Sequence, residues 1–320
     1  MINPREIYDL MLDVVSTDDA IIEDLKIGLT WTYCRSESTG LCMTADTRSR
    51  TFPWSGSLNG KRVSQIAPWI LEWDAMQSSI ALSAINSIIN ANTKKKRKSL
   101  PISPNTSSNL SVFNYFLSSI KDKNCVVVGR YPGLDKLQEQ YNLKVIEFNP
   151  GLMDHPATAS EFLLPEAEWV FLTGTSIANK TFPRLMELSQ NATVVLMGPS
   201  VPQLDELSLF GVDFIAGVDV VNDAKLQQLV SEAAGVHIFQ EAVQYSILDL
   251  SRTKMEETKN KISHTVKRRD RLKKEMETWY SDLRAGKFPK TCELVALDEE
   301  LSLLDSQYKQ LWDTRQNLAK

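Results

Sequence analysis

The chain has 320 residues, of which 42% are hydrophobic and 24% are charged, and its net charge is −4. This is an ordinary globular composition with room for two domains, and the charge excludes a general attraction to nucleic acid or to an anionic membrane. No apolar run reaches about 18 residues, the first residues have no apolar signal core, and the four cysteines form no CxxC pair. We therefore expect a cytoplasmic protein with no nucleic-acid partner, no membrane partner and no disulfide framework.

Residues 1–92 are predicted to form a small α+β domain. Apolar side chains alternate with smaller or polar ones along 27–33, which is typical of one half-buried strand, and residues 40–44 are its predicted hairpin partner. Two apolar stripes at helical spacing follow a glycine-rich turn. Residues 93–110 are basic, polar and interrupted by prolines, which indicates a linker. The basic run 94–98 has a nuclear-localisation or phosphate-binding patch as its alternative interpretation.

Residues 111–250 alternate short apolar runs with helical patterns. Each run is rich in β-branched residues and ends in a turn of glycines or hydroxyl side chains, which predicts buried parallel strands of a doubly wound α/β sheet. The runs are 125–129, 144–147, 169–172, 193–197 and 213–216. Because ligands bind outside the carboxyl ends of such strands, these turns are the predicted binding site.

The first turn, 129–133, lacks the second glycine of a dinucleotide fingerprint, because Tyr131 occupies that place. NAD or FAD binding is therefore disfavoured, whereas a nucleoside or a small anion remains compatible with the turn. Glu147 ends the second strand, where an acid would bind a ribose or a cation. A solvated carboxylate explains Glu147 equally well. Asp154 and His155 follow closely, so the three residues are the candidate metal ligands, although a solvated loop histidine is the simpler interpretation.

Small polar residues are dense in the later turns. Helix capping explains part of the segment 173–176 but does not require Asn179 as well, which favours contact with a ligand. Ser200 lies in a proline-rich turn at the next strand end. The predicted pocket contains Gly129, Pro132, Glu147, Thr173, Gly174, Thr175, Asn179, Gly198 and Ser200, and Thr30, Trp31 and Thr32 of the first domain are predicted to close it. No residue is assigned a catalytic role.

Residues 251–320 are predicted to form a coiled-coil-like helical hairpin, basic in its first helix and acidic early in its second. Pairing within the hairpin is favoured over nucleic-acid binding by the basic run. A hairpin alone buries its apolar stripe incompletely, so we expect a homodimer formed through it; the second predicted domain or another protein are the alternative partners. The stripe comprises Leu297, Leu301, Leu304, Tyr308, Leu311 and Leu318.

Several motifs along residues 5–250 resemble the heavy-metal-chelation domain family. They are GLTWT (28–32), GLCMT (40–44), GSLNG (56–60), ALSAIN (81–86), VVGRYPG (127–133), LLPEA (163–167), TGTSIANKT (173–181), GPSVP (198–202) and GVDFIAG (211–217). The resemblance implies an enolase N-terminal-like domain followed by a Rossmann-like domain, with a ligand site between them. One departure lies at 147–150, where the family is expected to have a second charged residue after the glutamate.

The resemblance also implies a function, which is binding or handling of a metal ion or of a metal-chelating small molecule in the interdomain cleft. A divalent or heavy metal ion is the cofactor that it suggests. Two other functions stay open: an enzyme acting on a nucleoside-containing or anionic small molecule, with Glu147 holding a ribose, and a non-catalytic assembly protein that acts through the hairpin.

Overall fold

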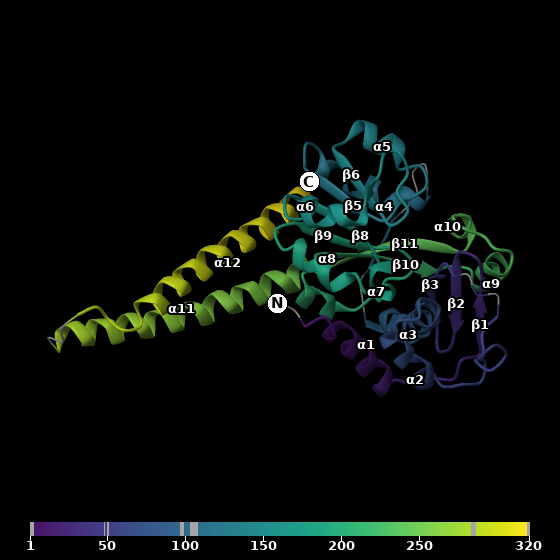
Figure 1. Ribbon diagram of the computed structural model, residues 1–320, viewed down its shortest axis with the longest axis horizontal. Coiled ribbons are helices and arrows are strands. Elements are labelled where there is room, and N and C mark those ends of the chain that lie inside the picture. The colour runs from purple at the N-terminus through teal and green to yellow at the C-terminus, as the bar shows by residue number, and fades with distance from the viewer. Residues whose placement is uncertain are drawn as a thin grey trace. The chain divides into compact units, whose positions relative to one another are not determined.

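The computed structural model describes residues 3–47, 49, 51–96, 99–102, 108–282 and 286–318 (Figure 1). The chain forms two compact units, Met1–Leu250 and Ser251–Lys320. The first unit contains both the predicted small α+β domain and the predicted parallel sheet. The α/β class is confirmed.

The N-terminal part of the first unit, α1 to α3, is built around a small antiparallel sheet in the order β1-β2-β3. Helix α3 packs on β2 and β3 and contacts α1. The elements are α1 (Glu6–Thr17), β1 (Asp24–Ile27), β2 (Trp31–Arg35), β3 (Thr39–Met43), α2 (Val63–Ile66), η1 (Ala67–Leu71) and α3 (Ala75–Lys96).

The prediction of one strand along 27–33 is wrong, because the chain turns back between β1 and β2. The amide N–H of Gly28 donates to the carbonyl of Trp31 at 3.0 Å, and Leu29 at the turn is 83% exposed. A Cβ on Gly28 would lie 2.4 Å from the carbonyl oxygen of Val230, so only glycine fits there. Leu29 fits the apolar alternation of the sequence, but its side chain lies in the turn and faces solvent.

Strand β3 and helix α3 approach each other closely at Gly40. A Cβ at this position would lie 2.1 Å from the carbonyl oxygen of Ser83 and 2.3 Å from the backbone nitrogen of Ser87. The glycine therefore lets the two backbones meet directly, and the face of α3 that packs here is buried.

The second part of the first unit is an eight-stranded sheet in the order β4-β11-β10-β9-β8-β5-β6-β7. The five predicted strands are present and run parallel, and β7 adds to them. Strand β11 is antiparallel to both of its neighbours and was not predicted. The strands are β4 (Leu100–Pro101), β5 (Cys125–Val128), β6 (Leu143–Glu147), β7 (His155–Pro156), β8 (Trp169–Thr173), β9 (Thr193–Met197), β10 (Phe214–Val220) and β11 (Val243–Asp249).

The predicted linker contains regular structure at three places. Residues 93–96 form the last turn of α3, Leu100–Pro101 pair with β11, and Ser108–Leu110 form the short helix η2. Residues 97, 98 and 103–107 of the linker lie outside the described part of the chain. The remaining helices of this part are α4 (Ser111–Ile120), α5 (Asp135–Gln140), η3 (Ala157–Ala159), α6 (Ser160–Leu163), α7 (Thr175–Ala178), α8 (Phe182–Leu188), η4 (Asp205–Phe210), α9 (Asp223–Ser231) and α10 (Ile238–Glu241).

One carboxylate joins the two parts of the first unit. Asp223, the first residue of α9, accepts hydrogen bonds from the hydroxyls of Tyr33 and Thr39 and pairs with Arg35. All three donors lie on β2 and β3. Burial, followed by the charge of Asp223, raises the pKa of Tyr33 to about 12, so the phenol stays a donor at neutral pH.

The second unit is an antiparallel pair of helices, α11 (Ser251–Ser281) and α12 (Thr291–Leu318). Ion pairs join the basic first helix to the acidic second, at 3.3 Å between Arg268 and Glu293 and at 3.8 Å between Arg269 and Asp298. The expected pairing within the hairpin is therefore present. No helix in the described chain is both long enough and apolar enough to cross a bilayer.

Candidate functional site

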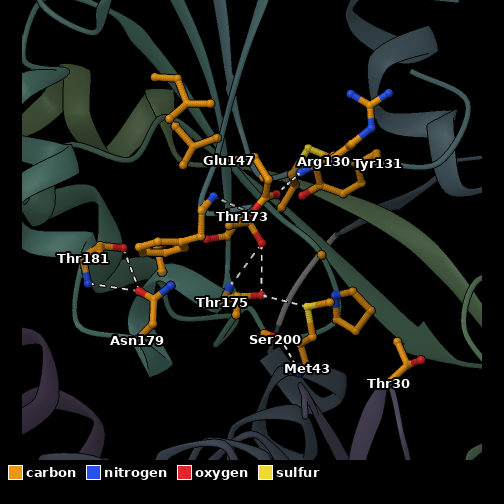
Figure 2. Close-up of a pocket in the computed structure, with 18 of the residues that line it drawn as sticks. Thr30, Met43, Arg130, Tyr131, Glu147, Thr173, Thr175, Asn179, Thr181 and Ser200 are labelled. Atoms are coloured by element: carbon orange, nitrogen blue, oxygen red, sulfur yellow. Dashed lines mark hydrogen bonds between the residues drawn. The ribbon is translucent and has the colours of Figure 1, made fainter. Parts of the chain in front are cut away.

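A cavity of about 750 Å³ lies at the carboxyl ends of β5, β6, β8 and β9 (Figure 2). The strand order explains its place: the chain passes from β5 to β6 on one side and then crosses to β8 on the other. The carboxyl ends of strands separate at such a point, which leaves a crevice. Ten of the twelve predicted ligand-binding residues line this cavity, namely Thr30, Trp31, Gly129, Pro132, Glu147, Thr173, Thr175, Asn179, Gly198 and Ser200.

The turn after β5 passes directly beside the end of β8. Gly129 has φ +100°, and a Cβ there would lie 3.1 Å from the side chain of Thr173. Gly198, after β9, has φ +110°. Left-handed backbone of this kind favours glycine, so both glycines are needed to turn the chain tightly around the cavity.

The hydroxyl groups at the end of β8 are bonded largely to one another. Thr173 donates to the hydroxyl of Thr175 at 3.1 Å, and Thr175 donates to the sulfur of Met43 at 3.7 Å (Figure 2). The side-chain oxygen of Asn179 accepts from both the amide and the hydroxyl of Thr181. Asn179 thus shapes the turn before α8. Its amide nitrogen makes no hydrogen bond within the described residues and is available to a ligand.

The N-terminal part supplies one wall of the cavity. The indole N–H of Trp31 donates to the carbonyl of Gly235 at 3.0 Å, and its ring meets the ring of Phe239 edge-on. Ser200, which was expected to offer its hydroxyl to a ligand, instead accepts the amide N–H of Met43 at 2.9 Å and is only 2% exposed. The hydroxyl of Ser200 therefore links β3 to the loop after β9 through a hydrogen bond.

Two predicted residues lie outside the cavity. Thr32 is fully buried, and its hydroxyl is 2.9 Å from that of Thr44. Successive residues of a strand face opposite sides, so Thr32 turns away where its neighbour Trp31 faces the cavity. A Cβ on Gly174 would lie 2.6 Å from the side chain of Val201, which shows that Gly174 packs against the loop after β9.

The candidate metal ligands Glu147, Asp154 and His155 do not form a three-ligand cluster. The side chain of Asp154 is fully buried. Its carboxylate pairs with the guanidinium of Arg130 and accepts a hydrogen bond from the amide N–H of Gly151. His155 is exposed on β7. Within the described ranges no three His, Cys, Asp or Glu side chains gather closely enough to hold a metal ion. The ion pair between Arg130 and Asp154 could not be predicted from the sequence.

Several lining residues were not predicted to contact a ligand. Tyr245 comes from β11 and stacks on Phe239, with ring centroids 4.9 Å apart. Tyr131, which the sequence marked only as a departure from the dinucleotide fingerprint, also lines the cavity and packs edge-on against Phe113. Burial raises the pKa of both phenols. No sequence signal pointed to Tyr245, because its strand was not predicted.

The charged groups around the cavity differ in their partners: some form ion pairs, and others form only hydrogen bonds. Arg130 pairs with two aspartates, and Arg184 pairs with two glutamates. The ammonium of Lys180 donates to the hydroxyl of Ser78 and to a carbonyl, and burial lowers its pKa. Glu147 is the one carboxylate among the lining residues of the described chain. Its oxygens accept the amide N–H groups of Arg130 and Phe148 at 2.8 and 2.7 Å.

Fold and cavity together define an α/β protein with a ligand-sized site at the carboxyl ends of its parallel strands. The DUF364 family model, described as "Putative heavy-metal chelation", matches residues 111–249, and the DUF4213 model, with the same description, matches residues 8–89. The chain is 30% identical to a crystallised DUF364-family protein of Desulfitobacterium hafniense, with a TM-score of 0.65, over 77% of this chain and 98% of that one. The chain therefore belongs to the DUF364 family.

Two other relatives extend this comparison. A DUF364-family structure from Pyrococcus horikoshii has a TM-score of 0.61 over 77% of this chain and 99% of that chain; at 17% identity it shows the fold alone. An uncharacterized protein of Methanocaldococcus jannaschii is 30% identical over 112 residues, 33% of this chain. The match spans 43% of that relative's length. The two family descriptions indicate metal-related binding.

The donor groups of the cavity do not fit a metal ion held by the protein alone. Its one carboxylate, Glu147, does not form a cluster with two further acidic, histidine or cysteine side chains of the described chain. The thiols are no substitute, because Cys42 is fully buried and burial raises its pKa to about 12. A thiol must lose its proton to bind a metal, so Cys42 stays inert at neutral pH. The soft donors on the described wall are the thioethers of Met43 and of the fully buried Met197, and two thioethers are too few for a closed site.

Proposed function

We propose that the protein binds a small organic molecule that chelates a metal ion, in the cavity between its N-terminal part and the carboxyl ends of the parallel strands. The protein contacts the organic part of this complex, and the chelator supplies most of the metal ligands. The observation that carries the proposal is the combination of a cavity of about 750 Å³ with the absence of a three-residue metal cluster in the described chain.

The walls of the cavity support an organic ligand. Apolar and aromatic side chains such as Val128, Ile146 and Phe239 share them with a few hydroxyls and one carboxylate. Small-molecule sites have this character and volumes of roughly 300–1,000 Å³. The family descriptions supply the second support, since both refer to metal chelation.

Protein purified without added chelators tests the proposal. We expect native mass spectrometry to show an organic mass that leaves on denaturation, and elemental analysis to show one metal per organic molecule. In Thr175→Phe the added ring fills the cavity next to Met43, so the organic molecule and the metal should be lost together. Ser302→Phe, on the exposed surface of α12, is the matched control and should retain both. A stoichiometric metal without any organic mass would show that the protein holds the ion itself.

We further propose that the helical hairpin mediates self-association. Leu297 and Leu301 of the predicted stripe are 2% and 7% exposed, so they are already covered. Other large apolar side chains are free instead, among them Leu303 at 67% and Trp312 at 49% exposed. Burying each such side chain contributes roughly 1.5–3 kcal/mol, and symmetric dimers are the commonest assembly.

Light scattering tests the hairpin. The full chain is expected to be a dimer, and a chain ending at Leu250, the boundary of the first compact unit, should be a monomer. Leu303→Glu should weaken the dimer because it places a charge in the contact, whereas Ser302→Glu on the neighbouring position should change less. A monomeric full chain, or a shortened chain that still dimerises, contradicts the proposal.

A further inference from the structure

Glu147 is fixed in place before any ligand arrives. It ends β6 and is partly buried, and each of its carboxylate oxygens accepts one backbone N–H: Oε2 from Arg130 at 2.8 Å and Oε1 from Phe148 at 2.7 Å. A carboxylate oxygen has about two lone-pair positions. One acceptor position therefore remains on each oxygen, and the residue lines the cavity.

The neighbouring acids are occupied, but Glu147 has no cationic partner in the described chain. Asp135 and Asp154 both pair with Arg130, and neither lines the cavity. Glu147 forms no ion pair with any described residue. A pre-positioned carboxylate of this kind loses little conformational entropy on binding, which favours groups that donate two hydrogen bonds at once.

We propose that Glu147 binds two hydroxyl groups on adjacent carbon atoms of the ligand, one hydroxyl at each carboxylate oxygen. This inference rests on the proposed function, because it assigns a subsite within the same cavity. A metal ion does not fit this position, since no second and third acidic, histidine or cysteine ligand of the described chain lies beside Glu147. A guanidinium offers the same two donors, but it would bring an additional charge to a wall formed by Val128, Ile146 and Phe148. A neutral diol has the smaller desolvation cost.

The inference also limits the ligand's metal-binding group. Hydroxyls that donate to Glu147 keep their protons, so they do not bind the metal as alkoxide or phenolate oxygens. The anionic metal-binding groups therefore lie elsewhere on the same molecule. Adjacent hydroxyls have two common sources, a sugar ring such as ribose and a catechol ring, and both present the same pair of donors.

Two matched pairs of probes distinguish these sources on the full chain. Adenosine and 2′-deoxyadenosine differ by one ribose hydroxyl, and catechol and phenol differ by one ring hydroxyl. Calorimetry should show that at least one diol binds about 10- to 100-fold more tightly than its partner, which is the effect of one hydrogen bond to a charged group. A preference for adenosine alone identifies the sugar, and a preference for catechol alone identifies the aromatic ring.

Glu147→Gln should abolish this preference, because it should weaken binding of the diol more than binding of the partner that keeps a single hydroxyl. Glu161→Gln is the matched control: it makes the same chemical change at an acid that lies outside the cavity and should keep the preference. Thermal unfolding of both variants shows whether they fold. If Glu147→Gln fails to fold, Glu147→Asp takes its place, because it retracts the carboxylate by one methylene.

Three results would overturn the inference: no binding of either diol, a preference that persists in the Glu147 variant, or guanidine hydrochloride binding more tightly than the diols in a Glu147-dependent way. The proposed function fails separately. If a metal–organic complex co-purifies but the protein shows no diol preference, only the proposed diol subsite at Glu147 is contradicted. If the protein prefers the diol but never retains a metal complex, only the proposed binding of a metal chelator is contradicted.

Discussion

Replacing Gly40 with alanine is expected to lower the free energy of unfolding by about 4 kcal/mol or more, which is in the range reserved for severe core defects. The new Cβ would lie 2.1 Å from the carbonyl oxygen of Ser83 and 2.3 Å from the backbone nitrogen of Ser87. Both obstacles are backbone atoms of α3, so no side-chain rotation relieves the clash. Strand and helix must separate, which exposes the buried face between them. Denaturant unfolding followed by circular dichroism measures the loss.

Gly235→Ala is the control for this substitution. A Cβ there would have its nearest neighbour, the hydroxyl of Thr30, at 3.7 Å, which is ordinary van der Waals contact. The free energy of unfolding should change by no more than about 0.5 kcal/mol. If Gly40→Ala were as stable as Gly235→Ala, the close contact between β3 and α3 would be incorrect.

Trp31→Ala is expected to cost about 3–5 kcal/mol of stability and to open the cavity wall. Trp31 is 8% exposed and belongs to β2, yet its hydrogen bond and its aromatic contact are both with the segment around α10. Removing the indole leaves a gap lined by Phe239 that the surrounding backbone cannot fill. The melting temperature should fall by roughly 6–20 °C at about 2–4 °C per kcal/mol.

Trp31→Phe separates packing from hydrogen bonding. The smaller ring keeps most of the contact with Phe239 but loses the bond to the carbonyl of Gly235, which should cost about 1 kcal/mol. Equal losses for the alanine and phenylalanine variants would mean that the ring itself contributes nothing, and that the N-terminal part does not close the cavity through Trp31.

The parallel strands were predictable because burial on both faces leaves a plain pattern of β-branched residues, as in 193–197. Strand β11 lacked this pattern: Gln244 and Ser246 interrupt its apolar residues, and it joins the sheet antiparallel to β10. The turn at Gly28 was missed for a different reason. It depends on the approach of Val230, more than 200 residues away, which no local pattern records.

The lining of the cavity followed from topology, since turns after parallel strands meet at one edge of the sheet. The contacts of each side chain could not be predicted from this topology. Ser200 and Met43 lie far apart in the sequence but form a hydrogen bond, and Asp154 forms an ion pair with Arg130. Such pairings depend on tertiary geometry, so the sequence could name the residues of the wall but not those that remain free. Ligand binding by the wall stays a prediction.

The carboxylate of Asp223 has a consequence for how this family is divided. One family model covers the segment with β2 and β3, and a different one covers the segment that begins at α4. Yet three donors from the first segment converge on Asp223 in the second, and Trp31 and Met43 add further bonds across the same boundary. The two segments are thus matched by separate family models, yet side-chain bonds between them hold them together. Neither one expressed alone would retain the wall that shapes the cavity.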